Sequence, residues 1–440
     1  MSETAQGDPL TDLARRRGYL RLLLLAGALG IPVSLVAFVV LVGLHEAEHW
    51  VWEVAPPGAG DPPWWWPLPL LTLAGLLVGM IVRWLPGRGG HVPAGGLSAA
   101  PTPPAELPWV LLAAFVSLPL GAVLGPEAPL IATGGAVALF LGHRVGIEYG
   151  TQAASLVAVA GVAAAIASIF GNPVIALVMI IEVVGLGGRQ LTLLLLPCIL
   201  AVGVGGVIFT GLGSWTGLPI GSLTLPLSPT PPVQLDVADL LWTLPLAVVA
   251  ALGTRGIRGL ARTLMPRALA RPVPVTLIIG VAVGACAAAY SLITGRSPAD
   301  VALSGQETLA QLASAPASFS RGALVALLVF KGLGYGLSLS ALRGGPVFPA
   351  VCLGGALGVL AGALPGFGVI PALAVGIVAA TVSALQVPVS SIVLVAVLMG
   401  PTTQQIAPVL LVGGVVAFVT EQIAENGLQR PAKAESASAA

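Results

Sequence analysis

The sequence has little charge and few cysteines for its length. Of its 440 residues, 8% are Asp, Glu, Lys or Arg and 56% are hydrophobic, whereas about 25% of residues are charged in an average soluble domain. So little charge excludes a large soluble protein, because too few polar residues remain to cover a surface that faces water. The three cysteines, Cys198, Cys286 and Cys352, lie in apolar runs and are interpreted as small core residues rather than disulfides or metal ligands.

The sequence lacks the residues that several classes of function require. The net charge of +1 indicates no nucleic-acid partner, and no nucleophile–base set or cofactor loop is present, so neither an enzyme nor a bound cofactor is expected. The segment HEAEH places His45 and His49 one helical turn apart. It lacks a third ligand and differs in order from the zinc-protease motif, so a solvated helix end is preferred to a metal site.

Apolar runs of 18 or more residues recur along the chain, each long enough to cross about 30 Å of hydrocarbon. They predict an all-α polytopic membrane protein, since a β-barrel would show short alternating segments instead. The runs are interrupted by many of the 57 glycines and 38 prolines. Interrupted backbone at membrane depth is tolerated only where it is buried or lines a cavity. We therefore expect many short, tilted and broken helices whose ends meet inside the bilayer.

The few charges suggest an orientation and a division of the chain. Three consecutive arginines precede the first apolar run, acidic residues follow it, and five arginines from Arg255 to Arg271 form a second basic stripe. The positive-inside rule then predicts a cytoplasmic N-terminus in the cell membrane. We expect a cytoplasmic segment over 1–18, one multi-pass transport domain over 19–423, and a flexible tail over 424–440 without a regulatory domain.

The two halves of the chain resemble each other. The segment LGPEAPLIATGGAVALFLG aligns with GGPVFPAVCLGGALGVLAG, so that the glycine pair Gly134–Gly135 falls on Gly354–Gly355, and a later proline pair also aligns. Two such halves, at about 67–211 and 272–423, predict inverted-topology repeats with a binding site at their interface.

Glu127 is the only formal charge between Leu107 and Gly142. It lies in GPEAP, where a Gly-Pro turn opens a helix, and GGPVFP forms the corresponding turn of the second half. Amides at a helix start lack partners and carry partial positive charge. Two such ends at the midplane are predicted to bind a dehydrated anion without any lysine or arginine. Glu127 would then be a movable gate, and capping of its own helix is the alternative.

These motifs resemble those of the CLC family of chloride channels and proton-coupled chloride antiporters, from about Tyr19 to Ile423. The resemblance rests on GGHVP, GPEAP and GPVFP in that order, and on IIEVV around Glu182. It implies a homodimer with one pathway per subunit, gated by Glu127. The implied pathway residues are Gly89, Gly90, His91, Val92, Pro93, Gly125, Pro126, Ala128, Pro129, Gly345, Pro346, Val347, Phe348 and Pro349.

The sequence also departs from the pattern of that family. Gly90 replaces an anion-binding serine, and the adjacent His91 is either a pH-sensitive donor or a histidine in cytoplasmic water. Pro346 removes one amide that would face the anion, and Val347 replaces a phenylalanine. The last tyrosine is Tyr335, so the family's pore tyrosine near the C-terminus has no match. The central anion site is therefore expected to be wider and weaker than usual.

The sequence leaves two alternatives for the type of transport. The inner proton-passing glutamate of the antiporters aligns with Val183, as in the channels. Its neighbour Glu182 is a candidate inner proton site, although it points about 100° away on a helix, and an ion pair with Arg189 is the other interpretation. We predict channel-like passive flux of chloride or another small anion, with a proton-coupled antiporter as the alternative. A non-transporting membrane sensor or scaffold is a third hypothesis.

Overall fold

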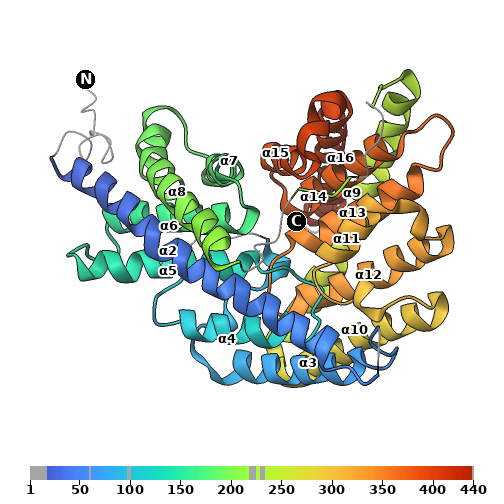
Figure 1. The fold of residues 1–440 in the computed structure, drawn as a ribbon, viewed down its shortest axis with the longest axis horizontal. Coiled ribbons are helices and arrows are strands. Elements are labelled where there is room, and N and C mark those ends of the chain that lie inside the picture. The colour runs from blue at the N-terminus through green and yellow to red at the C-terminus, as the bar shows by residue number, and fades with distance from the viewer. Residues whose placement is uncertain (1–16, 59–60, 97–100, 218–223, 228–232, 439–440) are drawn as a thin grey trace.

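The computed structural model describes residues 17–58, 61–96, 101–217, 224–227 and 233–438, without the side chains of 17, 189 and 427–438. The described part is almost entirely helical (Figure 1). Its α-helices are α2 (Arg17–His49), α3 (Pro67–Trp84), α4 (Leu107–Ser117), α5 (Glu127–Arg144), α6 (Gln152–Phe170), α7 (Pro173–Val184), α8 (Gly188–Thr216), α9 (Val237–Ala270), α10 (Pro272–Thr294), α11 (Gln306–Ser314), α12 (Arg321–Ala341), α13 (Val347–Ala361), α14 (Val369–Leu385), α15 (Pro388–Met399) and α16 (Thr403–Ser438).

The chain combines helices long enough to cross a membrane with apolar helices that are too short to span one. Among the described residues, eight helical stretches are long and apolar enough to cross a membrane, whereas the apolar helices α4, α7, α13 and α14 have 10–17 residues. At 1.5 Å per residue such helices cover only part of about 30 Å of hydrocarbon. The predicted all-α fold of many short and broken helices is confirmed.

Glycine and proline set the breaks between the short helices. Gly171 ends α6 in the left-handed conformation, with φ +58°. Pro173 then opens α7, where its missing N–H costs nothing, and the Asn172 side chain accepts hydrogen bonds from the next two amides. In the second half Gln386 takes the left-handed conformation at φ +62°, and Pro388 opens α15. The same kind of turn therefore recurs at corresponding places.

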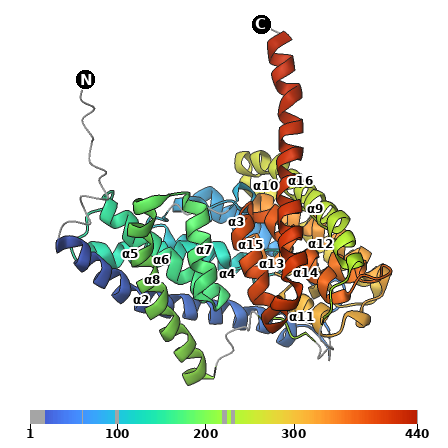
Figure 2. The same cartoon turned by 90° about the horizontal axis from the view of Figure 1, so that it is seen from above.

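The two repeats pack one helix pair through the same glycine contact. A Cβ atom added to Gly134 of α5 or Gly161 of α6 would collide with the backbone of the other, and Gly354 of α13 and Gly376 of α14 are related in the same way. These are positions that the sequence alignment places opposite each other. The helices α5–α8 gather on one side of the molecule and α13–α16 on the other (Figures 1 and 2).

The last helix, α16, extends well past the other helices (Figure 2). It is helical to Ser438, through most of the segment 424–440 for which a flexible tail was predicted. The six alanines of this segment are good helix formers, and composition alone did not distinguish a polar helix from a coil.

Substitution of Gly354 by Ala tests the repeated glycine contact. The new Cβ would overlap the carbonyl of Gly376 and lie 2.7 Å from the Cα atom of Ile377, so the helices must separate at a cost of about 1–3 kcal/mol. We expect a lower thermal unfolding midpoint in detergent. The control is Gly203→Ala in α8, where nothing lies within 4 Å of the new Cβ. Equal midpoints for the two variants would contradict close backbone packing.

Candidate functional site

The Gly-Pro turns of the two repeats meet and pair through their backbones. Gly125 N–H donates to the carbonyl of Gly345 at 2.8 Å, and Gly345 N–H donates to the carbonyl of Gly125 at 2.6 Å. Helix α5 begins at Glu127 and α13 at Val347, each two residues after its glycine. Both helix starts therefore bring their unpaired amides to one place, as the repeat predicted.

The carboxylate of Glu127 lies between the two helix starts. It is 1% exposed, and its Oε1 accepts a hydrogen bond from the Phe348 amide of α13 at 3.0 Å. The amides of Val347 and of Glu127 itself lie near the same carboxylate, but Phe348 N–H makes the hydrogen bond. A Cβ on Gly345 would collide with it, so that glycine leaves the space that the carboxylate fills.

Only one of the two carboxylate oxygens is held firmly. Oε2 of Glu127 is buried and has no hydrogen-bond partner among the described residues. An unpaired buried acceptor costs about 1–3 kcal/mol, so the carboxylate is an imperfect permanent occupant of this place. The hydrogen bond to Phe348 crosses from one repeat to the other, which distinguishes Glu127 from a residue that only caps its own helix.

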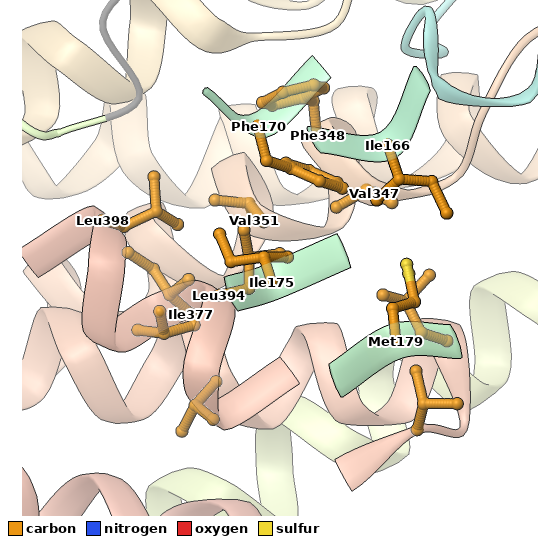
Figure 3. Close-up of a cluster of buried hydrophobic side chains, with 14 of the residues drawn as sticks. Ile166, Phe170, Ile175, Met179, Val347, Phe348, Val351, Ile377, Leu394 and Leu398 are labelled. Atoms are coloured by element: carbon orange, nitrogen blue, oxygen red, sulfur yellow. The ribbon is translucent and has the colours of Figure 1, made fainter. Parts of the chain in front are cut away.

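An apolar cluster lies on the far side of the α13 helix start. The amide of Phe348 faces Glu127, but the phenyl ring of Phe348 packs against that of Phe170, with ring centroids 6.1 Å apart. Val347, Ile175 and Met179 belong to the same buried cluster (Figure 3). The backbone of the predicted motif thus faces the site, while its side chains belong to the core.

The predicted first motif, GGHVP, lies beside α5. Its Gly89 and His91 line a cavity of about 70 Å³ together with Ala128 and Pro129 of α5. His91 is exposed, and its Nε2 lies 2.9 Å from the carbonyl oxygen of Gly96. The remaining predicted residues of this loop do not line the cavity; they are Gly90, Val92 and Pro93.

Tyr335 reaches the site, which the sequence did not predict. It is fully buried in α12, and its hydroxyl donates to the carbonyl of Pro346 at 2.6 Å. The sequence indicated only that the family's pore tyrosine near the C-terminus has no match, and no role was assigned to Tyr335. The contact joins two different helices around a turn, and helical periodicity within α12 gives no signal for it.

Arg343 is a second residue that sequence reasoning missed. Its side chain is 3% exposed and lines the cavity beside Gly344 and Pro129. A fixed cation therefore lies near the two turns, and the expectation that helix starts alone bind the anion did not take it into account. The signal was available, since Arg343 is an isolated charge directly before GGPVFP.

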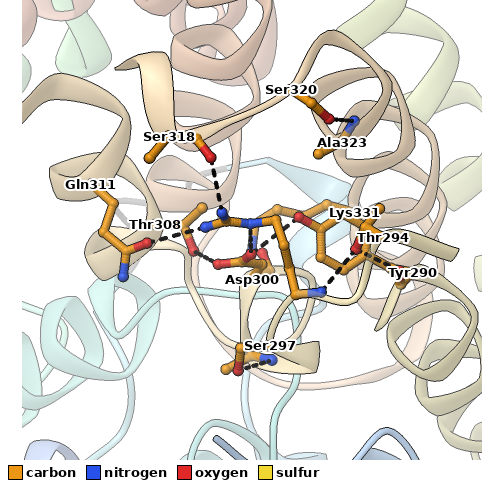
Figure 4. A network of polar contacts seen from close by, with 12 residues as sticks. Tyr290, Thr294, Ser297, Asp300, Thr308, Gln311, Ser318, Ser320, Ala323 and Lys331 are labelled. Atoms are coloured by element: carbon orange, nitrogen blue, oxygen red, sulfur yellow. Dashed lines mark hydrogen bonds and ion pairs between the residues drawn. The ribbon is translucent and has the colours of Figure 1, made fainter. Parts of the chain in front are cut away.

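A polar network supports the segment that leads to Glu127 (Figure 4). The ammonium group of the fully buried Lys331 donates to the carbonyls of residues 300–303 at 3.0–3.3 Å. The Asp300 side chain is held by Arg296 at 2.8 Å and by Tyr290 at 3.1 Å. The Leu303 amide then donates to the carbonyl of Gly121, four residues before the first turn.

The comparison with known families identifies this arrangement. A family model described as "Voltage gated chloride channel", the CLC model, matches residues 74–422. The chain belongs to the CLC family. The predicted family resemblance is therefore confirmed over most of the chain, in a range that contains the three segments GGHVP, GPEAP and GPVFP.

Similar proteins support the same family. The "Putative ion-transport protein YfeO" of Escherichia fergusonii is 30% identical over 357 residues, which cover 79% of this chain and 80% of that protein. A protein of the same description from Escherichia coli strain SMS-3-5 matches to the same extent.

Solved structures with the CLC fold cover nearly the whole chain. A slow cyanobacterial Cl⁻/H⁺ antiporter has a TM-score of 0.70 at 18% identity, covering 92% of this chain and 94% of its own. A CLC-type fluoride/proton antiporter has a TM-score of 0.72 at 19% identity, covering 92% and 96%. A eukaryotic CLC transporter has a TM-score of 0.65 at 18% identity, covering 92% and 72%.

Glu182, the predicted candidate for an inner proton site, contacts the other repeat of this CLC chain. Its carboxylate accepts hydrogen bonds from the amides of Val389 and Ser390 at 2.9 and 2.7 Å, and from the Ser390 hydroxyl at 2.6 Å. It therefore caps the N-terminus of α15. Val183 packs against the apolar cluster. The alternative ion pair involves Arg189, whose side chain lies outside the described residues.

Replacement of Glu182 by Ala tests the cap between the repeats of this CLC protein. Loss of three hydrogen bonds to a charged group should destabilise the fold by about 1.5–3 kcal/mol, measured as a lower unfolding midpoint in detergent. Glu425→Ala removes an exposed acid from α16 and should leave the midpoint nearly unchanged. A Glu182→Ala midpoint equal to that of the control would show that the cap adds no stability.

Proposed function

We propose that the protein exchanges a small anion, with chloride as the first candidate, for protons across the membrane. Membership of the CLC family supports anion transport. The observation that carries the finer proposal is the buried Glu127 carboxylate, which has one oxygen on the Phe348 amide and the other unpaired. Such a group occupies an anion site in its ionised form and can leave that site once it is neutral.

Competition for the same amides explains how two ions become coupled. The ionised carboxylate of Glu127 fills the space beside Gly345 and closes the pathway there. Protonation removes the charge that the helix starts attract, so the side chain can swing away and a mobile anion can take its place. When the anion leaves, the proton can be released on the other side as the carboxylate returns. Amide dipoles suit this cycle because a full positive charge beside the ion would slow its release.

The comparisons favour the antiporter over the channel-like flux that the sequence predicted. Two similar solved structures are described as Cl⁻/H⁺ and fluoride/proton antiporters. Passive flux remains the second candidate because Val183 aligns with the inner proton-passing glutamate of the antiporters. The adjacent Glu182 carboxylate already accepts hydrogen bonds from the start of α15. A proton would then need another inner route.

The other predictions about assembly and orientation belong to the same proposal. We infer a homodimer with one pathway per subunit, a transport domain over 19–423, and a cytoplasmic N-terminus in the cell membrane. The family resemblance supports the dimer. Four of the five arginines of the basic stripe lie in the C-terminal half of α9, and Arg271 follows its end. The acidic cap Asp236 precedes its start. This asymmetry supports the orientation.

Proteoliposomes with a chloride gradient and no initial pH gradient test the proposed exchange. Wild-type protein should drive protons uphill against the direction of chloride movement, measured with an internal pH-sensitive dye. Glu127→Gln should still conduct chloride, lose the proton movement and lose most of the pH dependence of flux, because the side chain can no longer titrate. The exposed Glu46→Gln is the matched control and should behave as wild type.

Two results would contradict the proposal in different ways. Chloride flux without uphill proton movement in the wild type would exclude antiport and support the channel-like candidate. A Glu127→Gln variant with unchanged proton coupling would show that the gate and the proton carrier lie elsewhere.

A further inference from the structure

The cavity beside the two turns is built from both repeats. Its walls include the first turn of α5 at Ala128 and Pro129, the loop after α3 at Gly89, and the segment Arg343–Gly344. Along α5 the cavity is lined by the first two turns only, at Ala128, Pro129, Ile131 and Ala132. A volume of about 70 Å³ holds roughly five waters at 10–15 Å³ each, so a small anion with one or two waters fits.

Arg343 presents an incompletely paired cation to this cavity. Its Nε and Nη2 donate to the carbonyl of Arg88 at 3.3 and 3.1 Å. Its Nη1 donates to the carbonyls of Ala341 and Leu342 at 3.0 and 3.3 Å. A guanidinium has five N–H donors, so one donor on Nη2 has no acceptor among the described residues.

Among the described residues, no carboxylate forms an ion pair with Arg343. The described ion pairs of buried or half-buried arginines join Arg255 and Arg258 to Glu421, and Arg296 to Asp300. A buried cation without a counterion is unfavourable. Lys331 also has no ion pair among the described residues, but its ammonium group donates to the carbonyls of residues 300–303. Lys331 does not line this cavity.

The loop opposite Arg343 is folded to hold the guanidinium in place. Gly87, Arg88, Gly89 and Gly90 all have positive φ, at +67°, +50°, +69° and +89°, which is uncommon for the arginine. This conformation turns the Arg88 carbonyl toward Arg343. A Cβ on Gly89 would lie 3.6 Å from Nε of Arg343, so the loop and the side chain form one unit.

We propose that Arg343 is the charged group of an inner anion-binding site, one step along the pathway from Glu127, and that its ligand is a small monovalent anion. The site rests on the anion transport proposed above and is independent of proton coupling. Gly90 leaves the GGHVP loop without a hydroxyl, and the free N–H of Arg343, supplied by the other repeat, takes over the role of donor. The anion supplies the missing counterion.

Chloride flux measured from each side of oriented proteoliposomes tests this site. Arg343→Gln should raise the half-saturating chloride concentration on the side of the α9 arginines by about tenfold or more, the loss expected for a charge-assisted hydrogen bond. The opposite side should change little. Arg343→Lys keeps the charge and should lose less than Gln. The matched control is Arg267→Gln, which removes an exposed arginine of α9 outside the cavity.

A second variant covers a folding failure of Arg343→Gln. Ala132→Leu places extra volume in the cavity without removing any hydrogen bond of Arg343. It should raise the half-saturating concentration on the same side only. If either folded variant keeps wild-type half-saturation on that side, or if the increase is equal on both sides, Arg343 serves only the structure and the proposal is wrong.

Equilibrium chloride binding separates this proposal from the proposed exchange. Titration calorimetry on purified wild-type, Arg343→Gln and Arg267→Gln proteins measures binding without transport. A wild type that conducts chloride without protons would exclude antiport and leave the Arg343 comparison intact. In a wild type without measurable flux, loss of chloride binding in Arg343→Gln alone would still support the site, and equal binding in all three proteins would overturn it.

Discussion

The candidate site depends on two reciprocal backbone hydrogen bonds between Gly125 and Gly345. Each glycine precedes a helix whose first amides have no partner within the helix. In hydrocarbon such amides would each be costly, and a single broken helix could not satisfy them. Joined as a pair, the two helix starts surround one polar point and can share one negative group. The carboxylate of Glu127 is that group in this structure, and it comes from one repeat while Phe348 N–H comes from the other.

The helix pairs around this point are held by close backbone contacts at glycine, in addition to the packing of large side chains. Between helices in a bilayer there is little hydrophobic driving force, so close packing at small residues carries much of the association. The same glycine contact holds α5 to α6 and α13 to α14. Because each pair is fixed as a unit, the position of a helix start is set by glycines more than one helical turn away from it. Glu182 adds a polar connection between the repeats at the start of α15.

The sequence predicted the features that are local or repeated. Apolar runs broken by glycine and proline predicted the fold class, the registration of glycine pairs predicted the repeats, and an isolated acid in a Gly-Pro turn pointed to Glu127. The sequence did not reveal the contacts of Tyr335, Arg343 and Glu182, because each joins segments whose separation follows no helical period. Arg343 carried the same signal as Glu127, a lone charge at a turn, but dipolar helix ends already explained anion binding without a cation.

The pairing of a movable acid with a fixed cation constrains how an ion can pass. The charge of Arg343 is partly neutralised by the carbonyls of Arg88, Ala341 and Leu342, so its field on a nearby anion is weaker than that of a free guanidinium. When the Glu127 carboxylate occupies the helix starts, that point carries one negative charge. When a chloride ion takes its place and the carboxylate is protonated, it again carries one. Under the proposed function, the exchange therefore leaves the electrostatic balance at the helix starts nearly unchanged. Two states with nearly the same net charge at the helix starts can interconvert without a large free-energy difference. Repeated transport requires such interconversion. A site with a stronger fixed charge would favour one of the two states and prevent it.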